Sequence, residues 1–167
     1  MVGPGNNRGG NNNYRGNPYP QDQRQRQEPA SPPRPAPAEK LPEEYADRAE
    51  QVIKKIGRPG NYDPGKLTFS LTNTKIRRLL SLMVGIVNAE RLRKEPLMSQ
   101  ESVEGLMMAR VRVAYEAGRD PEVSKFVKEA KLMEYIKGVG KDRKEFLRFA
   151  RYMEALVAWH RFYGGKN

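Results

Sequence analysis

The chain has 167 residues, of which 31 are Lys or Arg and 20 are Asp or Glu, so its formal net charge is +11. It contains no cysteine, which excludes disulfides, thiolate metal sites and cysteine nucleophiles. A charge this positive favours a polyanionic partner such as nucleic acid. No apolar run reaches the roughly 20 residues that cross a bilayer, and the polar N-terminus lacks the apolar core of an export signal. We therefore expect a cytoplasmic protein without a membrane partner.

Residues 1–40 differ in composition from the rest of the chain. They are rich in Gly, Asn, Gln and Pro, with scattered Arg and Tyr. Such a segment buries too little apolar surface to offset the entropy lost on ordering, so we predict a disordered tail. The tail contains six cations and three anions, so most of the positive excess lies in the predicted domain, residues 41–167.

From Leu41 onward, apolar residues recur three or four positions apart, as is typical of amphipathic helices. A first helix is expected to begin near Pro42 and to end at Gly57. A second is expected between a Thr72 N-cap and Pro96.

Three further helices are predicted from the same kinds of residues at helix starts and ends. Ser99 is a cap for a third helix that runs to Gly118. Asp120, followed directly by proline, begins a fourth helix that lasts until Gly138, and the fifth spans residues 141–165. Because no strand-like alternation competes, we predict an all-α fold, a compact bundle of about five helices after a disordered N-terminal tail.

The last predicted helix has two distinct faces. One is an apolar stripe suited to a core: Phe146, Phe149, Met153, Leu156, Val157 and His160. The other combines cations with aromatic rings: Lys144, Arg148, Arg151, Ala155, Trp159 and Phe162. A basic and aromatic face is typical of RNA-binding surfaces. The alternative is a solvated charged face whose aromatics are buried against a neighbouring helix.

The same combination occurs on two other predicted helices. On the third, Arg112 and Arg119 lie two turns apart with Tyr115 between them, opposite the apolar side. Guanidinium groups bind phosphate bidentately and stack on rings, which suits contact with a nucleic-acid backbone. The second helix has three cations near its start, Lys75, Arg77 and Arg78. The helix dipole also favours phosphate binding at this end. The alternative is that these cations are simply solvated on the helix surface.

Residues that could support catalysis are scarce. His160, the only histidine, lies on the apolar side of its helix and is expected to be packed and hydrogen-bonded. Arg110 projects into the apolar face of the third helix, and we expect it to pair with Glu154 or Glu134. One histidine and no cysteine do not form a typical zinc site. We therefore predict no catalytic residues, no metal and no cofactor.

Three blocks of the sequence resemble a known family. LTNTKIRRLLSLM, ARVRVAYEAGRD and FLRFARYMEALVAWHRFYGG are similar to the small helical subunit of type III-A CRISPR effector complexes, the Csm complexes. The resemblance extends over about residues 43–165, and its most specific part is the last block.

The resemblance implies a non-catalytic RNA-binding structural subunit. Such subunits stack in several copies along the guide–target RNA duplex and support target RNA binding in antiviral defence. The implied partners are CRISPR RNA and target RNA, the RAMP-type backbone subunit, the large subunit, and neighbouring copies of the chain. RNA-binding roles carry over to the matching positions Lys75, Arg77, Arg78, Arg112, Arg119, Arg148 and Arg151, and Lys144 is added from its helical face alone.

Two other classes of protein remain as alternatives. A small helical DNA-binding regulator would need a short helix-turn-helix and a dimer, whereas the cations here are spread over several long helices. A small all-helical enzyme would need a cluster of inward-facing charges, and only Arg110 clearly projects into a core stripe.

Overall fold

The computed structural model describes residues 1–3, 5, 36–60 and 65–166. It divides into two units, residues 1–34 and residues 35–167. Within the described residues, the helices lie in the second unit: α1 (Tyr45–Ile56), α2 (Asn73–Arg91), α3 (Gln100–Arg119), α4 (Pro121–Glu129), α5 (Leu132–Val139) and α6 (Arg143–Phe162). The predicted all-α class is confirmed, and these ranges contain six helices in place of about five. The disorder predicted for the tail falls mostly on residues 4 and 6–35, which lie outside the described residues.

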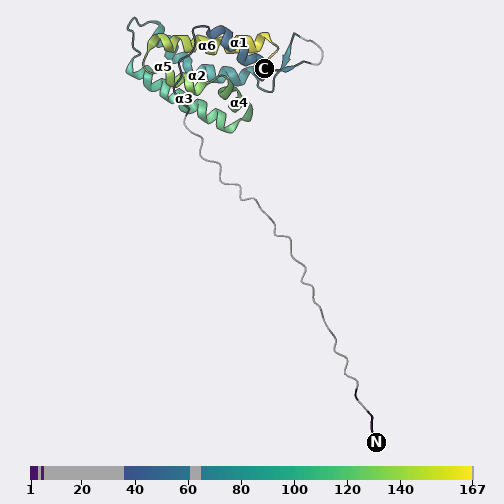
Figure 1. Cartoon of the computed structure of the whole chain (residues 1–167). Coiled ribbons are helices and arrows are strands. Elements are labelled where there is room, and N and C mark those ends of the chain that lie inside the picture. Colours follow the sequence, from purple (N-terminus) through teal and green to yellow (C-terminus); the bar gives the residue numbers. More distant parts are fainter. Residues whose placement is uncertain (4, 6–35, 61–64, 167) are drawn as a thin grey trace. The chain divides into compact units, whose positions relative to one another are not determined.

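α6 packs against both α1 and α2, and α2 packs in turn on α3 (Figure 1). The predicted apolar stripe of α6 is the centre of the core, where Phe146, Met153 and Leu156 are fully buried. The predicted stripe of α2 is buried against it at Ile76 and Met83. The 3.6-residue periodicity therefore identified the inward faces of both helices correctly.

The predicted packing of His160 is confirmed. Its side chain is fully buried, its Nε2 lies 3.0 Å from the backbone oxygen of Leu71, and its ring centroid is 4.4 Å from that of Phe69. A Cβ atom at position 165 would lie 2.1 Å from Nδ1 of His160, so glycine is needed at Gly165. Burial lowers the pKa of His160 below its ordinary value, although the contact with the Leu71 oxygen opposes the shift.

Because the pKa of His160 is lowered on folding, its contribution to stability is present above about pH 6.5 and is lost as the pH falls toward the folded-state pKa. The free energy of unfolding should therefore decrease between pH 7.5 and 5.5. Each unit of lowering corresponds to about 1.4 kcal/mol. Urea denaturation at several pH values measures this slope. Since His160 is the only histidine, the His160→Gln variant should be much flatter in this window, and an equal slope in both proteins would contradict the assignment.

The fourth predicted helix is divided in two, which corrects the expected run from Asp120 to Gly138. α4 ends at Glu129, and Lys131 adopts a left-handed conformation with φ of 50° before α5 begins. Side chains from other helices satisfy the freed carbonyl groups. The Tyr152 hydroxyl donates to the Ala130 oxygen over 3.0 Å, and a guanidinium nitrogen of Arg48 donates to the Glu129 oxygen over 3.2 Å. These tertiary contacts stabilise a break that carries no glycine or proline.

The packed region begins earlier than the predicted boundary at residue 41. Residues 36–41, named the strap here, lie along α5. The Glu39 amide donates to the Glu134 oxygen over 3.1 Å, and the Glu39 carboxylate is 2.8 Å from Nζ of Lys131. Lys137 donates to the backbone oxygen of Ala36, and Leu41 is buried in the core. The domain therefore includes the last residues assigned to the tail.

The strap requires a glycine beneath it. A Cβ atom on Gly138 would lie 1.8 Å from the Glu39 carbonyl oxygen. Gly138→Ala should displace the strap and lower the free energy of unfolding by about 1–3 kcal/mol, through lost hydrogen bonds and the Glu39–Lys131 pair. Urea denaturation measures the loss. Gly85 lies in α2, and a methyl group added there would meet nothing within 4 Å, so Gly85→Ala should instead raise stability by about 0.5–1 kcal/mol. Equal effects at both sites would contradict the close approach.

A short antiparallel pair follows α1, although no strand was predicted. β1 (Arg58–Pro59) pairs with β2 (Leu67–Thr68). The Leu67 amide also donates to the Tyr163 oxygen over 2.7 Å, so the pair is attached to the end of α6.

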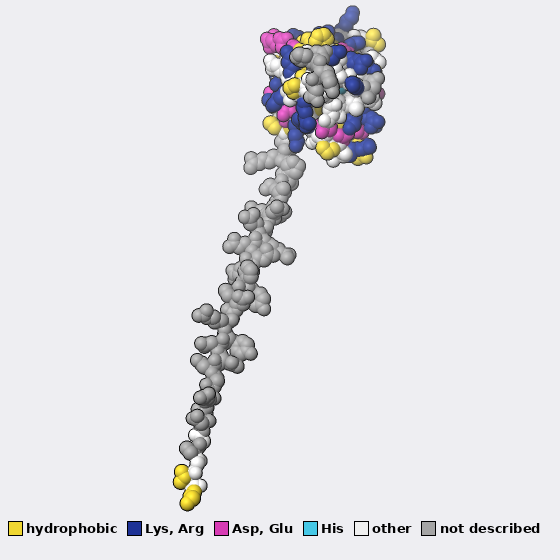
Figure 2. Space-filling view, turned by 90° about the vertical axis from the view of Figure 1, so that its right-hand side faces the viewer, with side chains coloured by type: hydrophobic (Ala, Val, Ile, Leu, Met, Phe, Trp, Pro, Cys, Tyr) yellow, Lys and Arg dark blue, Asp and Glu magenta, His cyan; other side chains and the backbone are white. Residues whose placement is uncertain are grey.

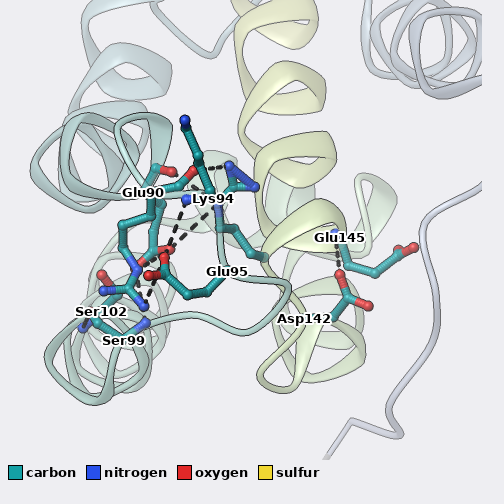
Figure 3. Close-up of polar contacts among 9 residues, drawn as sticks. Glu90, Lys94, Glu95, Ser99, Ser102, Asp142 and Glu145 are labelled. Atoms are coloured by element: carbon teal, nitrogen blue, oxygen red, sulfur yellow. Dashed lines mark hydrogen bonds and ion pairs between the residues drawn. The ribbon is translucent and has the colours of Figure 1, made fainter.

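A buried carboxylate joins α2, α3 and α6 (Figure 3). Glu90 is fully buried, and its Oε1 accepts the Ser99 amide over 3.0 Å at the start of α3. Arg143 of α6 donates to the Glu90 backbone oxygen over 3.1 Å, and the Arg93 guanidinium lies 3.5 Å from its Oε2. Burial alone would raise the pKa of Glu90, but hydrogen bonds from Ser102 and Ser99 and the charge of Arg93 outweigh it, so the pKa is lowered.

Candidate nucleic-acid interface

Three of the five predicted cations of α2 and α3 meet at one cleft. Thr72 caps α2, its hydroxyl accepting the Lys75 amide, and so fixes the first turn from which Lys75 and Arg78 project. The end of α3 lies opposite and supplies Arg119. Lys75, Arg78 and Arg119 line a cavity of about 330 Å³, named the α2–α3 cleft here. Its other lining residues are Thr72, Thr74, Leu79, Glu116, Asp120 and Val123.

Two carboxylates that were not expected at this site, those of Asp120 and Glu116, lie among these cations. Nζ of Lys75 is 2.5 Å from Asp120, and this ammonium is the main reason that the pKa of Asp120 is lowered. Guanidinium nitrogens of Arg78 and Arg119 lie 3.7 Å and 3.9 Å from Glu116. Both distances exceed hydrogen-bond range, and the two arginine side chains are 59% and 56% exposed. Such exposed pairs stabilise little, so an incoming phosphate can replace Glu116 at small cost.

Arg112 lies two turns before Arg119 on α3 and lines another hollow between α2 and α3. This hollow has a volume of about 210 Å³ and is also lined by Leu82, Ile86 and Met108. Arg77 is exposed on α2 and does not line either hollow. Of the five predicted cations on α2 and α3, three therefore line the α2–α3 cleft and Arg112 lines a second hollow between the same helices.

The three predicted cations of α6 are in different environments. Lys144 and Arg151 are exposed, and within the described part of the chain neither has an ion-pair partner. Arg148 has a side chain only 17% exposed, and it lies 3.5 Å from Glu43 and 3.4 Å from Glu145. It also donates to the Leu41 oxygen over 3.4 Å. Arg148 therefore holds the segment before α1 against α6, whereas Lys144 and Arg151 are available to a partner.

The two aromatic residues on this face of α6, Trp159 and Phe162, are in different environments. Nε1 of Trp159 donates to the Ala46 oxygen of α1 over 3.1 Å, and its ring stacks on Tyr163 at 5.9 Å. Phe162 meets the edge of Trp159 and stays 71% exposed. Trp159 is therefore partly buried against α1, whereas Phe162 is exposed.

The expected partners of Arg110 were wrong. Glu154 lies 3.5 Å from Arg91 of α2, and the Glu134 backbone accepts the strap. Within the described residues, Arg110 forms no ion pair and is half-buried between α3 and α5. Helical periodicity placed it on the inner side of α3, but it lies at the margin of the core.

Cations are distributed widely on the face of the folded unit drawn in Figure 2, with smaller groups of acidic side chains between them. Among the residues that the structure describes, no three His, Asp or Glu side chains form a group that could hold a metal ion. No helix in the described ranges is both long enough and apolar enough to span a membrane.

Comparison with known proteins gives one consistent result. Residues 46–166 match the family described as Csm2 Type III-A. The Streptococcus thermophilus protein named CRISPR system Cms protein Csm2 is 38% identical over 127 residues, which cover 75% of this chain and 95% of that protein. A Mycobacterium tuberculosis protein of the same name is 35% identical over 127 residues, covering 76% and 97%. The namesake from Enterococcus italicus is 33% identical over 95 residues, covering 56% and 68%.

Proposed function

This chain belongs to the Csm2 type III-A family, a structural subunit of the type III-A CRISPR complex, and we propose that it binds RNA there without catalysing a reaction. In this proposal it acts in a cytoplasmic antiviral ribonucleoprotein. Several copies stack along the duplex of CRISPR RNA and target RNA and support target binding. Its protein partners are the RAMP-type backbone subunit, the large subunit and neighbouring copies of itself.

The α2–α3 cleft is the observation that carries the RNA contact. It gathers Lys75, Arg78 and Arg119 around a hollow, and Arg112, two turns before Arg119, lines a second hollow between the same helices. Arg78 and Arg119 are exposed and only weakly paired. Cations placed between two helices can bind a phosphate backbone that runs along the boundary between α2 and α3. Arg77, Lys144 and Arg151 are exposed and add positive charge outside the cleft.

Contacts of this kind should not distinguish RNA sequences. Arginine and lysine neutralise phosphates, and phosphate contacts fix position without reading bases. Base pairing with the guide RNA then supplies the sequence specificity. Stacking of copies would be a head-to-tail contact, which leaves each end free for the next copy.

Titration of the full chain tests the proposal. Two single-stranded RNAs of unrelated sequence and one DNA duplex are compared by fluorescence anisotropy over a series of salt concentrations. We expect equal affinities for the two RNAs, with log K falling against log salt by about 0.7 per phosphate contacted. Clear preference for the duplex would instead support the small DNA-binding regulator. Dependence on one RNA sequence would contradict backbone binding.

A further inference from the structure

A second cleft, between α3 and α5, is distinct from the proposed RNA surface. It has a volume of about 240 Å³ and is lined by four apolar side chains, three cations and a glycine: Val103, Leu106, Met107, Ile136, Arg110, Lys137, Lys141 and Gly140. None of the eight proposed RNA-binding residues is among them. At this volume it is smaller than the roughly 300–1,000 Å³ of sites that enclose small ligands, so it suits a few side chains of a larger partner.

The charges of this cleft are not neutralised within the described residues. No carboxylate lines it, and neither Arg110 nor Lys141 forms an ion pair with a described residue. Lys137 is partly engaged, because its Nζ donates to the Ala36 oxygen of the strap. The cleft is therefore complementary to negative charge.

The apolar part of the cleft extends onto the exposed side of α3. Met107 is 53% exposed, and Val111, one turn further along the helix, is 59% exposed. Adjacent exposed apolar side chains are typical of protein–protein contacts, where Met and Arg are both enriched. The chemistry thus favours a protein over a nucleic acid.

We propose that the cleft between α3 and α5 binds an acidic, amphipathic segment of a partner protein. Apolar side chains of that segment would cover Met107 and Val111, while its carboxylates meet Arg110 and Lys141. This inference goes beyond the proposed RNA contact and concerns different residues.

Site-specific cross-linking in the assembled complex tests it. Full-length protein with p-benzoylphenylalanine in place of Val111 is expressed in cells that contain the complete complex, irradiated, and analysed by mass spectrometry. Val84, exposed on α2, receives the same group as the comparison position. We expect position 111, and not position 84, to join a segment of another protein that is net acidic with apolar residues at helical spacing.

A synthetic peptide with the cross-linked sequence is then titrated against the full chain. Its affinity should fall about tenfold or more with Arg110→Glu and Lys141→Glu combined. The control variant reverses two charges on α4, Lys125→Glu and Lys128→Glu, and should bind the peptide with unchanged affinity. RNA affinity of both variants is measured alongside, so that failure of this inference and failure of the RNA proposal are separable. Cross-links to RNA, to a second copy of this chain or to a segment without acidic residues would overturn the inference, as would no cross-link at position 111.

Discussion

Replacing Glu90 with alanine should lower the free energy of unfolding by about 3–5 kcal/mol, the usual effect of removing one partner from a buried charged network. Glu90 is fully buried, accepts the amide that begins α3 and lies beside Arg93. Its loss leaves the Ser99 amide without its acceptor, and among the described residues Arg93 keeps only the exposed carboxylate of Glu95. Urea denaturation at pH 7 measures the change.

Acid titration distinguishes the charge of Glu90 from its volume. Because the pKa of Glu90 is lowered on folding, its contribution is present above about pH 4.5 and is lost as the pH falls through the folded-state value. The difference between wild type and Glu90→Ala should therefore shrink in acid. Glu101 is an exposed residue at the start of α3, and Glu101→Ala should change stability by less than about 0.5 kcal/mol. A difference for Glu90→Ala that is unchanged at low pH would show that packing alone is responsible.

The second large effect concerns RNA affinity. Combined replacement of Arg78, Arg112 and Arg119 by alanine should weaken binding of unrelated RNA sequences equally, by about 100-fold or more if each loses 1 kcal/mol or more of phosphate contact. The fold should survive, since the only ion pairs of Arg78 and Arg119 within the described residues are long, exposed contacts with Glu116. Circular dichroism and anisotropy titration of the same samples measure both properties.

A variant with the same change in net charge controls for long-range attraction. Lys94, Lys125 and Lys128 are exposed and do not line the α2–α3 cleft. Their combined replacement by alanine should reduce RNA affinity far less than the combined replacement of Arg78, Arg112 and Arg119. Equal losses would mean that overall charge, and not the cleft, determines binding.

The inward faces of the helices could be predicted from the sequence because they depend on local periodicity. Thr72 and Ser99 have the side chains that cap helices, and both do so. The break at Lys131 could not be predicted in this way. A lysine with positive φ is unfavourable by itself, and it is stabilised here by Glu39, 92 residues away in the chain. The strap was likewise missed, because its composition matches that of the tail before it.

The candidate site was predictable to a similar degree. Helical periodicity indicated which cations lie on the outer faces of α2 and α3. It did not indicate that Lys75, Arg78 and Arg119 share one cleft, because that depends on how the two helices pack. Glu116 could have been suspected, since it lies three residues before Arg119 and four after Arg112. Arg148 was predicted to bind RNA from the basic face of the last helix. Its side chain instead contacts Glu43, more than one hundred residues earlier in the chain.

The most direct test of the RNA proposal is the salt dependence of binding by the wild type and by the Arg78, Arg112 and Arg119 triple variant, measured on one single-stranded RNA. If these arginines contact phosphates, the slope of log K against log salt should become shallower by about 2, at about 0.7 per lost contact. Lower affinity with an unchanged slope would contradict phosphate contact by these three arginines.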